Sequence, residues 1–217
     1  MTLLSNRFTY LILIFAVFPF LTGCSSAYID PDFAQFKQTH KKVAVLPFLV
    51  KIDSKRLGDV TVNDIENMQK ERGFEFQKQL HDRYLRNQRR GKYTVEFKDV
   101  AQINELLEAK SNNHDAYETL HLLTKPELCE LLEVDSVIVV NLELSKPLGM
   151  ATAVATTLLI GTGATERAVA SFAIYERDSG VRLWSYDTSM DGMIWTTSNR
   201  LVKSLIKETA REFPYRR

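Results

Sequence analysis

The segment Ser136–Leu144, SVIVVNLEL, decides the fold. Its first half is apolar without a break, the pattern of a strand buried on both faces, and its second half alternates apolar and polar residues. We therefore expect this strand to run through the centre of a sheet and to end half exposed. Just before it, Thr124 and Glu127 stand at capping-box spacing and predict the start of a short helix.

Three further segments have strand character. Val43–Phe48, VAVLPF, predicts a second buried strand, with Pro47 at its end or in a bulge because proline has no amide donor. Downstream, residues 167–176 and 181–188 predict two strands joined as a hairpin, with Gly180 available for a positive φ. We expect the aromatic side chains on the last strand, Trp184 and Tyr186, to pack rather than to recognise a ligand.

A long helix is predicted from about Asp64 to Arg90, because apolar residues recur there at three- and four-residue spacing. Gly73 weakens its middle and marks a candidate start of the well-packed part, and Gly91 ends it. Residues 51–63, before the helix, are charged and are expected to form a loop.

Four arginines close this helix, and they suit the negative end of the helix dipole. A phosphate or a lipid headgroup is the alternative partner for their charges. They are Arg83, Arg86, Arg89 and Arg90.

The remaining pattern completes the fold class. Tyr93–Phe97 alternates as a strand, Asp99 caps a short helix, and a last helix begins near Thr197 and frays before Pro214. The order β-α-β-α-α-β-β-β-α predicts an α/β fold, a mixed β-sheet flanked by helices. We expect one domain spanning residues 42–213.

The N-terminus predicts export. Phe8–Phe20 is an apolar run after a single basic residue, Arg7, and is short for a membrane span. The ending Leu21–Cys24, LTGC, resembles the lipobox of bacterial lipoproteins. This resemblance implies removal of residues 1–23 as a lipoprotein signal peptide and attachment of diacylglycerol and an acyl chain such as palmitate to Cys24. Residues 24–41 are then a lipidated, irregular tether; an uncleaved anchor helix is the alternative.

Composition limits the partners. The whole chain has 28 basic and 27 acidic residues, and residues 24–217 lack only Arg7 of these, which leaves 27 of each. This balance argues against nucleic acid as a partner. If Cys24 carries lipid, Cys129 has no disulfide partner, and its leucine-rich surroundings predict a buried thiol.

The sequence shows no constellation of catalytic residues, and we expect neither enzyme activity nor a cofactor. His114 and His121 lie seven residues apart with Glu118 between them, but a zinc site needs three or four ligands. Polar surface histidines are therefore the better interpretation. Gly161–Gly163 lacks the third glycine of a dinucleotide fingerprint.

Pro147–Thr165 contains nineteen residues without a charge. Three interpretations stay open for this uncharged insertion: a loop, a contact between subunits, or a segment that touches the membrane.

Three stretches together resemble a known group of envelope proteins: Val43–Phe48, Glu130–Val140 (ELLEVDSVIVV) and Tyr175–Ser185 (YERDSGVRLWS). They are similar to the periplasmic α/β domain of CsgG-like secretion lipoproteins, LpoB-like synthase activators and the amino-terminal domain of TolB. The resemblance and Ser25 imply a lipid anchor in the outer membrane, with the domain facing the periplasm. The chain lacks the long alternating strands of the pore-forming branch.

These observations predict a non-enzymatic, lipid-anchored scaffold that binds other envelope proteins, a role compatible with homo-oligomers. The alternative is an oligomeric outer-membrane secretion component in which residues 147–165 contact the bilayer. A third hypothesis is a cell-wall enzyme or ligand binder that uses His114, His121 or the helix arginines.

Overall fold

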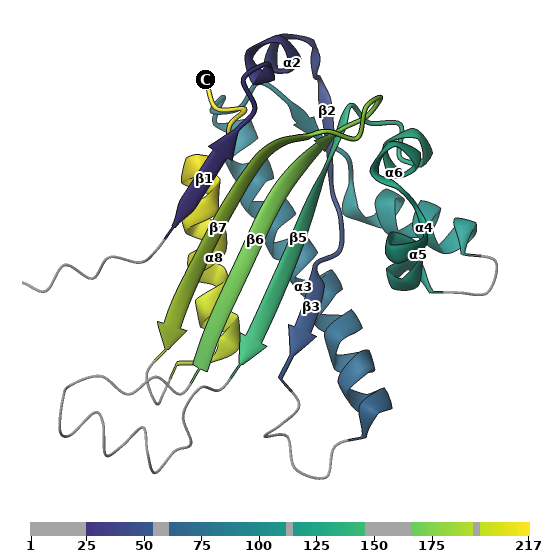
Figure 1. Cartoon of the computed structure of the whole chain (residues 1–217), viewed down its shortest axis with the longest axis vertical. Coiled ribbons are helices and arrows are strands. Elements are labelled where there is room, and N and C mark those ends of the chain that lie inside the picture. The colour runs from purple at the N-terminus through teal and green to yellow at the C-terminus, as the bar shows by residue number, and fades with distance from the viewer. Residues whose placement is uncertain (1–24, 54–60, 112–114, 146–165, 193–195) are drawn as a thin grey trace, which may run out of the picture.

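The computed structural model of the chain describes residues 25–53, 61–111, 115–145, 166–192 and 196–217 (Figure 1). These residues form one mixed sheet of seven strands flanked by six helices, which confirms the predicted fold class. In chain order the elements are β1 (Ser26–Ile29), α2 (Phe33–Thr39), β2 (Lys42–Val45), β3 (Leu49–Ile52), α3 (Val62–Arg89), β4 (Glu96–Phe97), α4 (Val100–Lys110), α5 (Ala116–Leu122), α6 (Lys125–Leu131), β5 (Ser136–Ser145), β6 (Glu166–Glu176), β7 (Arg182–Gly192) and α8 (Ser198–Glu212).

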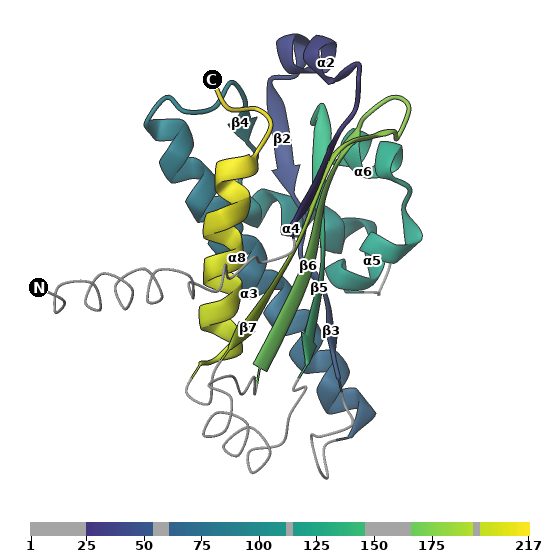
Figure 2. The ribbon, with the colours of Figure 1, turned by 60° about the vertical axis from the view of Figure 1, so that its left-hand side comes forward.

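The strand order is β1-β7-β6-β5-β2-β4, and β3 continues beside β5 where β2 stops. β2 and β3 run parallel to β5, and β4 runs parallel to β2. β5, β6, β7 and β1 are antiparallel neighbours. Helices α3 and α8 cover one face of this sheet, while α4, α5 and α6 lie on the other face near β2 and β5 (Figure 2).

The central strand β5 has the two halves that its sequence predicts. Ser136–Val140 is buried on both faces, whereas Asn141 and Glu143 are exposed and alternate with buried leucines. Val137 and Val139 pack with α4–α6, and Ile138 and Val140 pack toward α3 and α8. The burial of β5 changes halfway along the strand because α4–α6 cover only its first half.

Pro47 lies in a bulge, as expected. Val45 is opposite Ile138 and Leu49 is opposite Asn141, so β5 advances by three residues while the partner advances by four. The prediction of a loop from residue 51 is wrong at its start, because β3 extends to Ile52. Leu49–Ile52 resumes pairing with β5 once the proline, which cannot donate to the ladder, has been passed.

Helix α3 is close to its predicted range. Thr61 caps it in a capping box with Asp64, and Gly91 follows its end at φ +68°. The fully buried residues of the helix begin at Gly73, which confirms that position as the start of the packed part.

The C-terminus is held in place, which corrects the expectation of a frayed end. Phe213 is extended because it precedes proline, and it is 1% exposed; Tyr215 is completely buried. The Thr94 amide donates to the Tyr215 carbonyl at 3.0 Å. The expected strand Tyr93–Phe97 is reduced to β4, because Tyr93 pairs instead with Arg216 as an isolated bridge.

The irregular tether expected for residues 24–41 is also corrected within its described part. Ser26–Ile29 pairs antiparallel with β7 as the edge strand β1, and Phe33–Thr39 forms α2. Phe33 is buried against the Tyr215 ring at a centroid distance of 5.1 Å. The sequence of these residues has no strong pattern of apolar residues. The conformation of β1 is decided by pairing with the open edge of the sheet, and that of α2 by packing against the aromatic core.

Two smaller expectations are confirmed. Cys129 is buried, and burial raises the pKa of its thiol to about 12. Trp184 and Tyr186 are 1% and 4% exposed and pack in the core with parallel rings. Among the described helices, none combines the length and the apolar character needed to cross a membrane.

Candidate functional site

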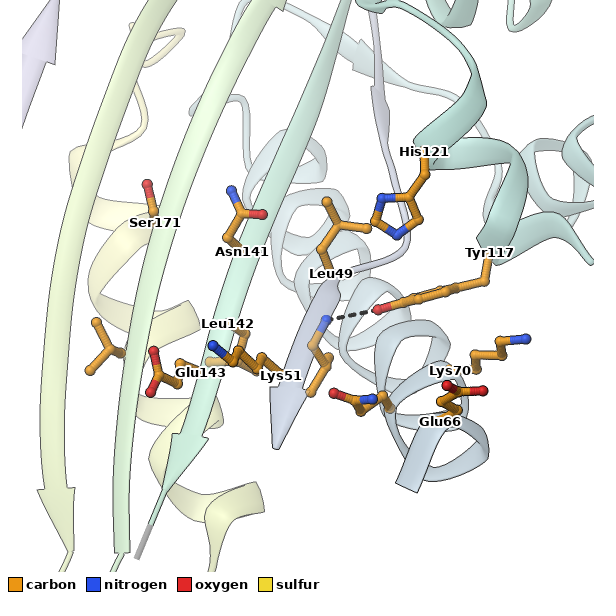
Figure 3. Close-up of a pocket in the computed structure, with 13 residues that line it drawn as sticks. Leu49, Lys51, Glu66, Lys70, Tyr117, His121, Asn141, Leu142, Glu143 and Ser171 are labelled. Carbon is orange, nitrogen blue, oxygen red and sulfur yellow. Dashed lines mark hydrogen bonds between the residues drawn. The ribbon is translucent and has the colours of Figure 1, made fainter. Parts of the chain in front are cut away.

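A cleft of about 500 Å³ lies at the open end of the sheet, beside α5. Residues of β3, β5 and β6 form one side, Tyr117 and His121 of α5 form the other, and the first half of α3 closes one end (Figure 3). The cleft is lined by Leu49, Val50, Lys51, Glu66, Gln69, Lys70, Tyr117, His121, Asn141, Leu142, Glu143, Val169 and Ser171.

Two lining side chains cap the outer edge of β3. The Val50 amide donates to the Tyr117 hydroxyl at 2.8 Å, and the Ile52 amide donates to Gln69 Oε1 at 3.1 Å. An uncapped edge strand is a template for unwanted pairing, and these two contacts remove its free donors. Burial raises the pKa of the Tyr117 phenol although the bond from Val50 opposes this shift, so Tyr117 acts as a fixed acceptor.

The charges of the cleft are partly neutralised. Lys70 Nζ lies 2.6 Å from Asp115 and 3.1 Å from Glu118 at the base of α5. Hydrogen bonds to Asp115 and then to Glu118 raise the pKa of Lys70. The lysine thus ties α3 to α5, while exposed Lys51, Glu66 and Glu143 supply the surface charge of the cleft.

The sheet continues beyond the cleft as an open face. Cross-strand partners carry it from Asn141 through Ser171 to Asp187, and from Glu143 through Val169 to Ser189. Val169 is 42% exposed and Tyr28, on the edge strand β1, is 41% exposed. An antiparallel sheet tolerates a polar face in water, and this face carries the two exposed apolar side chains Val169 and Tyr28.

The structure describes one of the two candidate metal-ligating histidines, and this one has the expected surface position. His121 is exposed at the cleft, as predicted for a surface histidine, and Glu118 bonds to Lys70. His114 lies outside the described residues. Within the described ranges, no group of three or more histidine, cysteine, aspartate or glutamate side chains is placed to hold a metal ion.

The arginines of α3 separate into two pairs. Arg83 and Arg86 line a groove between α3 and α8, while Arg89 and Arg90 are exposed at the end of the helix. Cys24 and residues 147–165, the predicted lipid site and uncharged insertion, lie outside the described residues. Near the insertion, Ser145 of β5 is opposite Arg167 of β6, so the insertion lies between two adjacent antiparallel strands in the sequence.

The three stretches that carry the family resemblance have structural roles. Val43–Phe48 forms β2 and its bulge, and Asp135 accepts from the Lys41 and Lys42 amides at 2.7 and 2.8 Å, which holds the start of β2 beside β5. In the hairpin, Glu176 accepts from the amides of Asp178 and Ser179, and Gly180 has φ +66°. These motifs predict the fold, but none of their residues lines the cleft.

No family model matches the chain, and no curated protein matches it. Several solved structures, however, match the chain in fold. A PelC variant from Paraburkholderia phytofirmans, solved as a dodecamer, is 12% identical over 89% of this chain and 99% of that one, with a TM-score of 0.47. Lipoprotein GNA1162 from Neisseria meningitidis is 13% identical over 79% and 96%, also at 0.47. The LpoB C-terminal domain from Salmonella enterica is 6% identical over 70% and 84%, at 0.35.

One of these solved structures is of the LpoB C-terminal domain, and the CsgG-like and TolB parts of the expected resemblance stay predictions. At these TM-scores and identities we draw no functional conclusion from the likeness.

Proposed function

We propose that this chain is a lipid-anchored accessory protein of the bacterial envelope that binds another envelope protein and performs no catalysis. The lipobox-like LTGC motif supports the anchor at Cys24, and Ser25 together with the family resemblance supports an outer-membrane address with the domain in the periplasm. The observation that carries the binding role is the half-covered sheet, whose open face presents Val169 beside the cleft.

The chemistry of the cleft favours binding over catalysis. Its hydrogen-bonded side chains Tyr117 and Gln69 satisfy backbone amides, and Lys70 satisfies two carboxylates. These groups shape and stiffen the cleft. A partner surface then finds apolar side chains flanked by exposed Lys51, Glu66 and Glu143, so the cleft combines apolar and charged groups.

Binding through the open face predicts a position-specific crosslink. A photo-crosslinking amino acid in place of Val169 should join this chain to a distinct envelope protein in living cells, whereas the same group in place of Val181 should not. Val181 is a matched control, because it is also a valine, is 46% exposed, and lies at the β6–β7 turn, at the other end of the strands. Val169→Arg should abolish recovery of that protein while Val181→Arg preserves it. Equal crosslinking at both positions would contradict the proposal.

The alternative function is an oligomeric secretion component in which residues 147–165 contact the bilayer. One observation favours this alternative function. Ser145 and Arg167 are opposite each other, so the strands on either side of the insertion are neighbours in the sheet.

Removal of the lipid site separates the two functions. For a tethered accessory protein, Cys24→Ala behind an export signal that is cleaved without lipid attachment should abolish function, leave the melting temperature unchanged and release the processed chain from membranes, because two acyl signals supply the stable anchoring. Membrane fractionation with and without residues 147–165 measures this. If the chain stays in the membrane fraction only when residues 147–165 are present, the result supports the alternative. If a released Cys24→Ala form restores normal function in cells, the anchor is incidental.

A further inference from the structure

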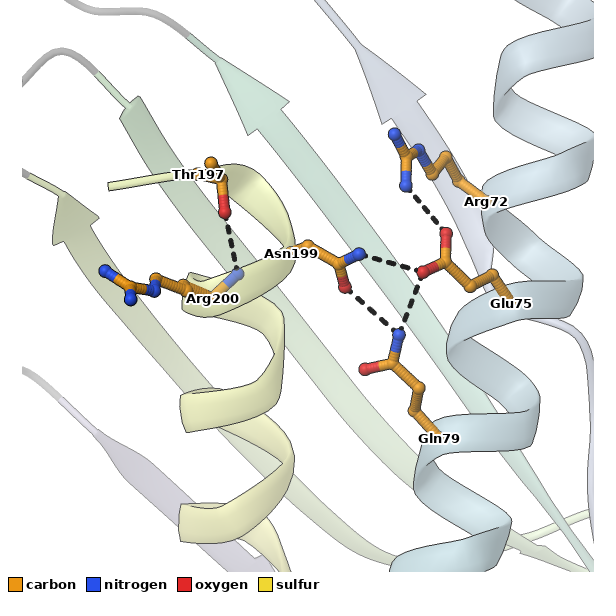
Figure 4. Close-up of polar contacts among 6 residues, drawn as sticks. All are labelled: Arg72, Glu75, Gln79, Thr197, Asn199 and Arg200. Carbon is orange, nitrogen blue, oxygen red and sulfur yellow. Dashed lines mark hydrogen bonds and ion pairs between the residues drawn. The ribbon is translucent and has the colours of Figure 1, made fainter. Parts of the chain in front are cut away.

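Helices α3 and α8 lie side by side on the covered face of the sheet (Figure 2). A polar network joins them near the start of α8 (Figure 4). Asn199 Nδ2 donates to Glu75 Oε1 at 2.9 Å, and Gln79 Nε2 donates to Asn199 Oδ1 at 3.1 Å. Arg72 donates to the other Glu75 oxygen at 2.7 Å. This network fixes the spacing of the two helices.

Beyond Gln79 the same two helices border a groove of about 340 Å³. Arg83 and Arg86 of α3 and Lys203 and Lys207 of α8 all line it. Spacings of three and four residues place each pair on one face of its helix, so the two helices direct four cations at one space. The sequence shows the arginines of α3 but gives no sign that two lysines 120 residues later join them.

Within the part of the chain that the structure describes, these four charges have no carboxylate partner. The one carboxylate that lines the groove, Asp82, lies 3.1 Å from Lys78, on the outer surface of α3. None of the four cations has an ion pair with a described carboxylate. Four positive charges and one negative charge leave the groove at +3, in a chain whose formal net charge is only +1. Like charges at helical spacing repel, so the arrangement costs stability unless an anion binds.

One donor in the groove also lacks an acceptor. Arg83 Nε is buried and has no hydrogen-bond partner among the described residues. A buried unpaired donor costs free energy, and a bound water or anion would satisfy it. The planar guanidinium fits two oxygens of a phosphate, while lysines add charge without fixed geometry.

We propose that the groove between α3 and α8 binds a phosphate-bearing ligand. Arg83 and Arg86 bind the phosphate oxygens, and Lys203 and Lys207 neutralise the remaining charge from the opposite wall. The groove offers too few oxygen ligands for a divalent cation. The phosphate comes either from a phospholipid headgroup or from a small soluble anion. The site is on the other side of the sheet from the open face, so it is independent of the proposed partner surface.

The test is calorimetric titration of the full-length, detergent-solubilised protein with three probes. They are inorganic phosphate, water-soluble dihexanoyl phosphatidic acid and zwitterionic dihexanoyl phosphatidylcholine. A lipid headgroup site binds phosphatidic acid much more tightly than phosphate, whereas a site for soluble anions binds the two alike. Phosphatidylcholine should bind weakly in either case. Failure of both phosphate and phosphatidic acid to bind overturns the proposal.

Two double variants distinguish the groove from general surface charge. Arg83→Gln with Lys207→Gln should weaken binding about tenfold or more, because hydrogen bonds to charged groups are among the strongest. Arg89→Gln with Arg90→Gln removes the same charge outside the groove and should leave the affinity unchanged. Equal weakening in both double variants overturns the proposal.

Stability supplies a second, independent readout. Without ligand, the Arg83→Gln, Lys207→Gln protein should melt at or above the wild-type temperature, since the substitution relieves repulsion between unpaired cations. A markedly lower melting temperature would show that the cations serve the fold and would overturn the proposal.

Discussion

Phe213→Ala is expected to lower the free energy of unfolding by about 3–5 kcal/mol, the range for removing a buried aromatic ring. Phe213 is 1% exposed, and its ring centroid lies 4.5–6.3 Å from those of five other aromatic residues. They are Tyr84, Tyr93, Phe97, Trp184 and Tyr215. Because these rings come from α3, β4, β7 and the C-terminus, the cavity would loosen several elements at once.

Urea denaturation monitored by tryptophan fluorescence measures this effect, since Trp184 lies beside the lost ring. Phe74→Ala is the matched control. Phe74 is only half-buried and contacts Tyr117 at a centroid distance of 6.3 Å, so its loss should cost clearly less. If both variants lose the same stability, the aromatic cluster around Phe213 is not the centre of the core.

Gly73→Ala should destabilise the protein although alanine is the better helix former. A Cβ at this position would lie 2.5 Å from the Phe48 carbonyl oxygen and 2.6 Å from Tyr117 Cε2. Neither neighbour can retreat freely. The Phe48 amide donates to the Gly73 carbonyl at 3.1 Å, and the Val50 amide holds the Tyr117 hydroxyl. Gly73 thus lets α3 approach the link between β2 and β3.

The size of this effect follows from two opposing contributions. Alanine gains about 1 kcal/mol in helix propensity, and overpacking costs typically about 1–3 kcal/mol, occasionally more. With backbone on one side, we expect the upper part of that range and a net loss of about 2 kcal/mol, or a melting temperature lower by roughly 4–8 °C. Scanning calorimetry measures this change in melting temperature.

Lys78→Ala, on the exposed surface of the same helix, is the control and should change the melting temperature little. An equal or raised melting temperature for Gly73→Ala would show that α3 can move away from the sheet. Because Tyr117 lines the cleft, Gly73→Ala should also weaken the crosslink at position 169.

Much of the fold follows from local pattern. The two halves of Ser136–Ser145, the caps at Asp99 and Thr124, the glycines at 91 and 180, and the Pro47 bulge all form as predicted. The caps, the glycines and the bulge depend on interactions within a few residues. The two halves of β5 differ in the number of faces of the strand that are buried, and the pattern of apolar residues shows this number directly.

The errors occur where distant contacts decide the conformation. Ser26–Ile29 becomes a strand because β7 offers an open edge, and Phe213–Tyr215 is ordered because an aromatic core surrounds it. Short segments of this kind carry little local information, so their own residues predict loops or frayed ends.

By itself, the sequence determined the α/β class, the central strand and the long helix with its arginines, and its lipobox-like motif predicts lipid attachment at Cys24. Only the tertiary structure decided which residues form the cleft and the groove on which the two proposals rest. The cleft unites residues from β3, α3, α5, β5 and β6, and the groove unites Arg83 and Arg86 with Lys203 and Lys207. Periodicity shows which side of an element is buried, but which two elements face each other depends on how the whole core packs.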